Sequence, residues 1–91
     1  MIYRNDSQIN LESELLKNIA RIHTTPMGEE RIRRNLALED DVQDIVAWCR
    51  DRIDSPEAVI TRKGKNWYCT VDGGIITVNA YSFTIITAHK E

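Results

Sequence analysis

The sequence predicts an α+β domain in which two or three N-terminal helices pack on one face of a four-stranded, mainly antiparallel meander sheet. Two observations carry this prediction. Apolar residues recur at helical spacing before residue 56, and they alternate at strand spacing between residues 59 and 88. Three short turn sequences divide the second region into four strands.

The length of 91 residues sets the domain organisation. A second domain would be too short to bury a core of its own, so we expect a single domain over 1–91, with a helical part at 1–56 and a sheet at 57–90. A chain of this size buries little more than ~60% of its unfolded surface. A homodimer would bury more, and it is therefore a candidate assembly.

Three helices are expected. Asn10 is a good N-cap for the first, which runs to about Ile22 with one apolar face. Thr25 followed by Pro26 is an N-cap with a first-position proline, and it predicts a second helix that ends near 35–37. Asp40 or Asp41 is expected to cap a third helix that runs to about Ile53 and carries its apolar stripe on Val42, Ile45, Val46, Cys49 and Ile53.

The four strands are expected at 59–62, 66–71, 75–79 and 83–88. Asp72-Gly73-Gly74 is a strong hairpin signal, because these residues tolerate positive φ. In the second strand, alternation places Trp67 toward the helices and Tyr68 on the opposite face. One face of the sheet is thus expected to stay uncovered.

Composition limits the function classes. The formal net charge is −2, so no global basic field would attract nucleic acid, yet residues 57–91 carry +1 while residues 1–56 carry −3. Cys49 and Cys69 are interpreted as buried hydrophobes in a reducing compartment, and no Cys/His grouping predicts a metal site. No apolar run resembles a signal peptide or membrane span, and no motif calls for a cofactor, so a cytoplasmic protein is expected.

Three stretches of the chain, at 22–36, 62–68 and 76–90, resemble the uncharacterised prokaryotic family known as domain of unknown function 3781. They read IHTTPMGEERIRRNL, RKGKNWY and ITVNAYSFTIITAHK, and the resemblance spans residues 11 to 90. It implies no activity, and no catalytic residue is carried over from it.

A second resemblance concerns architecture. Helices followed by a four-stranded antiparallel sheet whose last strand ends in Thr87-Ala88-His89 are similar to the RelE-type and colicin-type ribonuclease toxins. Those toxins cut RNA with basic and hydroxyl residues on an open sheet face. This chain departs from them in its acidic net charge.

His89 is the candidate catalytic residue, because histidine suits the acid and base steps of RNA cleavage by the 2′-hydroxyl. Cations would stabilise the charged transition state. The candidate ligand-binding residues near it in this interpretation are Arg62, Lys63, Lys65, Tyr68, Asn79, Tyr81, Thr87 and Lys90. Alternatively, His89 is a frayed terminal residue and the basic turn is a solvated hairpin tip.

A second candidate site precedes the second helix, where free backbone amides can hold an anion. His23 lies just before it, and Arg31 and Arg34 could clamp a phosphate one turn further on. Plain capping with exposed arginines is the alternative.

The leading hypothesis is a small cytoplasmic binding or regulatory module for RNA or a phosphate-bearing ligand on the open sheet face. One alternative is a metal-independent RelE-like ribonuclease toxin. The other is a protein-interaction or inhibitor module from a mobile element, which would use the acidic helical face to bind a protein partner.

Overall fold

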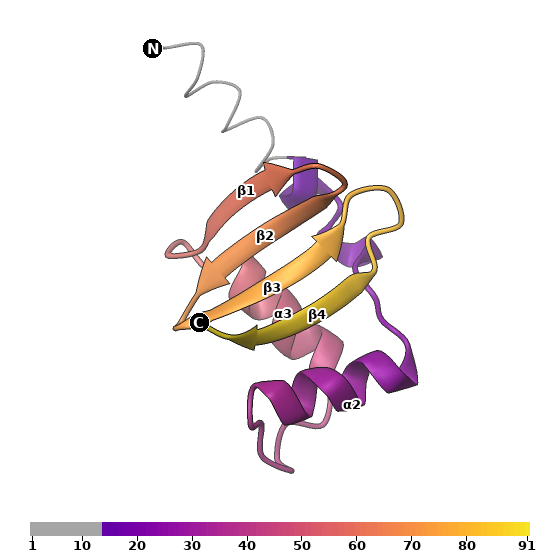
Figure 1. Ribbon diagram of the computed structural model, residues 1–91, viewed down its shortest axis with the longest axis vertical. Coiled ribbons are helices and arrows are strands. Elements are labelled where there is room, and N and C mark those ends of the chain that lie inside the picture. Colours follow the sequence, from indigo (N-terminus) through magenta and orange to yellow (C-terminus); the bar gives the residue numbers. More distant parts are fainter. Residues whose placement is uncertain (1–13) are drawn as a thin grey trace.

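The computed structural model describes residues 14–91. Helices come first and a sheet follows, as predicted (Figure 1). The proposed N-cap Asn10 and the start of the first helix lie outside the described residues; inside them, residues 14–17 are helical and lead into a short 3-10 helix. The elements are η1 (Ile19–Arg21), α2 (Pro26–Asn35), α3 (Ile45–Ile53), β1 (Val59–Lys63), β2 (Asn66–Val71), β3 (Gly74–Asn79) and β4 (Ile85–Lys90).

The sheet is a four-stranded antiparallel meander with the order β1-β2-β3-β4. The β2–β3 turn has the predicted chemistry: Asp72 and Gly73 take φ values of 52° and 75°, in the left-handed region that two-residue hairpins require. Gly64 in the β1–β2 turn has a φ of 61°. Strand directions in Figure 1 bring the β1–β2 and β3–β4 turns to one end of the sheet and the C-terminus to the other.

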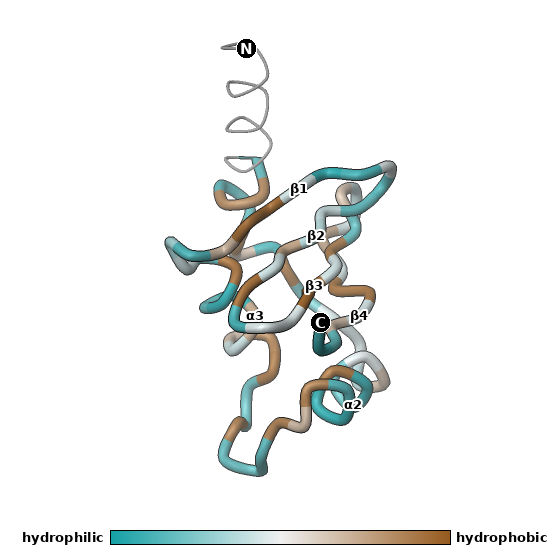
Figure 2. The backbone as a smooth tube through the Cα atoms, turned by 60° about the vertical axis from the view of Figure 1, so that its left-hand side comes forward, coloured by the Kyte–Doolittle hydropathy of each residue, from teal (hydrophilic) through white to brown (hydrophobic). Residues whose placement is uncertain are grey.

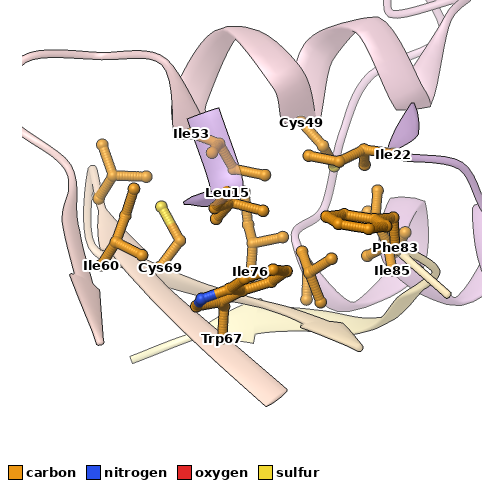
Figure 3. Close-up of a cluster of buried hydrophobic side chains, with 14 of the residues drawn as sticks. Leu15, Ile22, Cys49, Ile53, Ile60, Trp67, Cys69, Ile76, Phe83 and Ile85 are labelled. Atoms are coloured by element: carbon orange, nitrogen blue, oxygen red, sulfur yellow. The ribbon is translucent and has the colours of Figure 1, made fainter. Parts of the chain in front are cut away.

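The helices cover one face of this sheet. α3 lies behind the strands in Figure 1, and α2 lies beside β4. The core between these layers contains Trp67 and Cys69 from β2, Ile76 from β3, and Cys49 and Ile53 from α3, all buried (Figure 3). Figure 2 shows hydrophilic residues gathered at the β1–β2 turn and in the loop between α2 and α3. None of the helices described in residues 14–91 lies on the opposite face of the sheet.

α2 begins and ends as expected. The Thr25 side chain accepts a hydrogen bond from the Gly28 amide at 3.0 Å, and Pro26 is the first helical residue. The helix ends in a Schellman motif, in which the Ala37 amide bonds to the Arg34 carbonyl and the Leu38 amide to the Arg33 carbonyl. Ala37 there has a φ of 54°, a position that glycine usually occupies.

The start of α3 differs from the prediction. The helix begins at Ile45, with Asp44 as its cap at 2.9 Å from the Ala47 amide, rather than at Asp40 or Asp41. Arg33 of α2 is the reason, because its guanidinium donates to the carbonyl oxygens of Glu39 at 2.8 Å and Val42 at 2.6 Å. The segment thus stays in a loop, from which Val42 packs against the core.

The last strand also differs from simple alternation. A bulge interrupts the pairing of β3 and β4 between Thr77 and Val78, so Ile85 and Ala88 both face the core although they are three residues apart. Phe83 lies outside the strand with a φ of 60°, and its ring packs against Trp67 at 5.3 Å between centroids.

The segment before α2 attaches to the edge of β4. The His23 amide donates to the Phe83 carbonyl at 3.1 Å, the Ile85 amide donates to the His23 carbonyl at 2.7 Å, and Thr24 Oγ1 donates to the Ile85 carbonyl at 3.0 Å. This parallel bridge between His23 and Thr84 connects the helical part to the last strand.

No helix in residues 14–91 is both long enough and apolar enough to span a lipid bilayer.

Candidate nucleic-acid interface

The side chains on the uncovered face of the sheet, here called the open face, follow from strand pairing and alternation. Two neighbouring rows of paired residues each cross all four strands. No strand residue of the sheet is acidic. The first row is Thr61, Tyr68, Thr77 and Thr87, and the second is Val59, Thr70, Ile75 and His89.

Tyr68 lies in the middle of the open face, as the sequence predicted, while its neighbour Trp67 is buried on the other side. A groove of about 470 Å³ runs past its ring, between Thr61, Thr70 and the β1–β2 turn. Lys63 and Gly64 complete the lining beside Ile75. A half-exposed aromatic ring with hydroxyls and one cation around it can stack on a base and contact a phosphate.

The basic residues of the β1–β2 turn do not all face the same way. Lys63 belongs to the open face, and Lys65 is exposed in the turn. Arg62 faces the helical side, where its guanidinium lies 5.4 Å from the Trp67 ring centre and 5.7 Å from that of Tyr81. Arg62 and Tyr81 therefore cover the rim of the core instead of the groove.

The Asn79 side chain stabilises the β3–β4 turn. Its side-chain oxygen accepts hydrogen bonds from the amides of Tyr81 and Ser82, both at 2.9 Å, and from the Ser82 hydroxyl at 3.1 Å. The β3–β4 turn is held by these bonds, and the Ala80 amide ties it to the Lys65 carbonyl at 2.7 Å. Asn79 shapes the rim of the open face through this turn.

His89 lies in β4, paired with Ile75, and its side chain is exposed on the open face beside Thr87. Lys63 is three strands and four residue positions away, which places it at a distance of about 20 Å. Lys90 follows on the helical side. The structure thus gathers Lys63, Tyr68 and Thr87 on one face but does not bring His89 to the basic turn.

The second candidate site, at the start of α2, is occupied by the protein itself. His23 Nδ1 lies 2.8 Å from the Arg21 carbonyl oxygen, and His23 Nε2 lies 3.2 Å from the Thr84 hydroxyl. The Thr24 hydroxyl fills the space beside Gly28, which is buried. Arg31 and Arg34 are exposed on α2. Helix capping and side-chain packing account for the residues at the start of α2. His23 is also about 17 Å from His89, measured along the direction of β4.

The two thiols are buried and free of disulfides. Burial raises the pKa of Cys49 to about 12 and that of Cys69 to about 11, so both stay protonated at neutral pH. Within residues 14–91, no three His, Cys, Asp or Glu side chains are grouped as metal ligands would be.

Two arginines of α3 with structural or surface roles, Arg50 and Arg52, were missed from sequence. Arg50 donates to the carbonyls of Ala20 at 3.0 Å and Ile22 at 2.7 Å, a contact that depends on tertiary packing. Arg52 stacks on Trp48 at 4.4 Å, and their spacing of four on one helix was a usable signal.

The fold and this face define a small α+β domain with a sheet surface that no helix of residues 14–91 covers and whose strands carry no acidic residue. The chain belongs to the family described as protein of unknown function (DUF3781), whose model matches residues 16–89. The expected resemblance to this family is thereby confirmed. Neither a curated protein nor a solved structure matches the chain.

Proposed function

We propose that this domain is a cytoplasmic binding module that holds single-stranded RNA on its open face. The observation that carries the proposal is Tyr68, whose ring is half-exposed at the centre of a sheet face without acidic side chains. RNA-binding sheets use such rings as platforms for unpaired bases. The groove of about 470 Å³ beside it has room for a base, and Lys63 at its end supplies a charge for a phosphate.

The weak overall charge sets the expected strength of binding. With Lys63 and Lys65 as the exposed cations at the end of the groove, few phosphates are neutralised, so we expect modest affinity and a shallow dependence on salt. Stacking on Tyr68 would then supply most of the free energy of binding. The two buried cysteines, free of disulfides, accord with a reducing cytoplasm.

The test is a fluorescence-anisotropy titration of a labelled single-stranded oligoribonucleotide at low and at physiological salt. Tyr68→Ala should weaken binding about 5-fold or more, since one stacked base contributes roughly 1–3 kcal/mol, whereas Tyr68→Phe keeps the ring and should bind like the wild type. Lys63→Gln should lower the salt slope, with Lys17→Gln, an exposed residue on the first helix, as the matched control. Equal affinity of the wild type and Tyr68→Ala would contradict the proposal.

The ribonuclease alternative is separated by a second experiment. Since His89 and Lys63 are about 20 Å apart, the geometry favours binding over cleavage, and we expect total RNA incubated without metal to remain intact. Cleavage by the wild type that is lost in His89→Ala would replace the binding module with a toxin-like enzyme. The protein-interaction alternative predicts no RNA binding at either salt concentration.

A further inference from the structure

A second hollow lies on the helical side of the β2–β3 hairpin, away from the open face. Its volume is about 200 Å³, and it is partly open, with α3, the chain after α2, the hairpin and the end of β4 as its lining. Its walls are mainly apolar, and Trp48 forms one of them. The apolar residues that line it include Leu36, Leu38, Trp48, Val71 and Ile76.

Arg52 is fixed at the rim of this pocket. Its guanidinium stacks on the Trp48 ring at 4.4 Å, and its Nε lies 3.3 Å from Asp72 Oδ2. Both contacts hold the plane of the guanidinium, and the hydrogen bonds among residues 14–91 leave its terminal nitrogens unused. An arginine fork oriented in this way is suited to bind a carboxylate through two parallel hydrogen bonds.

Lys90 adds a second cation to the lining, so the pocket carries two basic residues and one acidic residue, Asp72. Glu91 comes next in the chain, but it lies outside β4 and is not among the residues that line the pocket. The local charge at the rim is thus positive, in a domain whose formal net charge is −2. A negatively charged group is favoured here in spite of the overall charge.

The volume of the pocket limits the size of the ligand's apolar group. An apolar cavity of roughly 150 Å³ is large enough to hold benzene, and 200 Å³ can accept one aromatic or branched side group. A larger ligand would have to leave most of its surface in water. We propose that this pocket binds a small free carboxylic acid that carries one aromatic or branched apolar group, with Arg52 and Lys90 on the carboxylate and the Trp48 wall against the apolar group.

This site is independent of the RNA proposal. The pocket lies on the helical side of the hairpin, whereas Tyr68 and the groove beside it lie on the open face, and Ile75 of β3 is the one residue that lines both. Either site can therefore exist without the other, and the probes that test them do not overlap.

The test is an NMR titration of the ¹⁵N-labelled protein with 3-phenylpropionate. The two tryptophans provide an internal control, because Trp48 lines the pocket whereas Trp67 is buried beneath the sheet near Phe83. We expect a saturable shift of the Trp48 indole N–H signal, with a dissociation constant of roughly 1 mM or tighter, and little change at Trp67.

Matched ligands and variants make the result specific. The neutral analogue 3-phenylpropanol and the short acid acetate should each bind at least about tenfold more weakly, since each lacks one of the two recognised groups. Arg52→Gln should weaken binding of 3-phenylpropionate to a similar degree, while Lys17→Gln, at an exposed position outside the pocket lining, should not. No saturable shift of Trp48, or equal affinity for the acid and the alcohol, would overturn the proposal whether or not the Arg52 variant folds.

Discussion

The hydroxyl of Thr24 lies where a Cβ atom on residue 28 would stand. Thr24 is held there by its hydrogen bond to the Ile85 carbonyl at 3.0 Å, so it cannot move aside without loss of a link between the helical part and β4. Gly28 is therefore required for packing, in a helix where alanine would ordinarily be preferred.

A side chain at position 28 should collide with the Thr24 hydroxyl. We expect Gly28→Ala to lower the free energy of unfolding by about 1–2 kcal/mol, because the new methyl group displaces the Thr24 hydroxyl. In a Thr24→Ala background the same change should be less destabilising, because the overlap with the Thr24 hydroxyl is gone and only the 3.3 Å approach to Thr25 Oγ1 remains. Denaturant unfolding of the four proteins of this double-mutant cycle measures the coupling, and additive effects would contradict the packing argument.

At Ala37, in contrast to position 28, an alanine occupies a site where glycine should be more stable. A non-glycine residue in the left-handed region costs roughly 1–2 kcal/mol, and Ala37 has a φ of 54° at the end of α2. Ala37→Gly should therefore stabilise the protein by about 1 kcal/mol. Ala47→Gly, inside α3, is the control and should destabilise it by about 0.5–1 kcal/mol. Thermal unfolding of both variants checks the sign.

The buried thiols predict a dependence on alkaline pH. Both pKa values are raised by burial from 9.0, to about 12 for Cys49 and about 11 for Cys69. The unfolded chain then loses these protons at lower pH than the folded one, so the stability contributed by the neutral thiols is complete below pH 9. It should decline as the pH rises from 9 towards 11 and 12.

Alkylation provides a direct measurement of the same property. The folded protein at pH 8 should resist iodoacetamide, and both cysteines should react once denaturant unfolds it. The Cys49→Ala and Cys69→Ala variants should show a smaller loss of stability above pH 9 than the wild type. Rapid alkylation of the native protein would show that the thiols are accessible.

Arg50 is predicted to be a structural arginine. It donates to two backbone carbonyls before α2, those of Ala20 and Ile22, and the Ile22 residue is fully buried. Arg50→Met should cost about 1.5–3 kcal/mol, as expected for hydrogen bonds from a charged donor. Arg31→Met, at an exposed position on α2, should change stability by no more than about 0.5 kcal/mol. Equal effects of the two substitutions would refute this role.

Local signals in the sequence predicted much of the fold. The Thr25-Pro26 pair placed the start of α2, and Asp72-Gly73 placed the β2–β3 hairpin. Alternation correctly put Trp67 in the core and Tyr68 on the open face. These succeeded because each depends on residues that are neighbours in sequence.

The predictions were wrong where the structure depends on contacts between residues that are far apart in the sequence. Three aspartates could each have capped α3, and the choice of Asp44 follows from the contacts that Arg33 makes with the preceding loop. Strand alternation could not foresee the bulge that turns both Ile85 and Ala88 inward. The grouping of His89 with the basic turn assumed proximity, whereas the register of four strands determines it.

The bridge between His23 and Thr84 has a consequence for biosynthesis. Thr24 and its partner Ile85 are 61 positions apart in the sequence, so the segment before α2 has no strand edge to attach to until β4 has been made. We expect ribosome-bound chains to stay protease-sensitive until residue 85 and those after it have left the exit tunnel. Protease protection of arrested chains of increasing length would show this as a late, abrupt step. Until then the His23–Thr24 segment would lack the backbone partners that it has at Phe83 and Ile85.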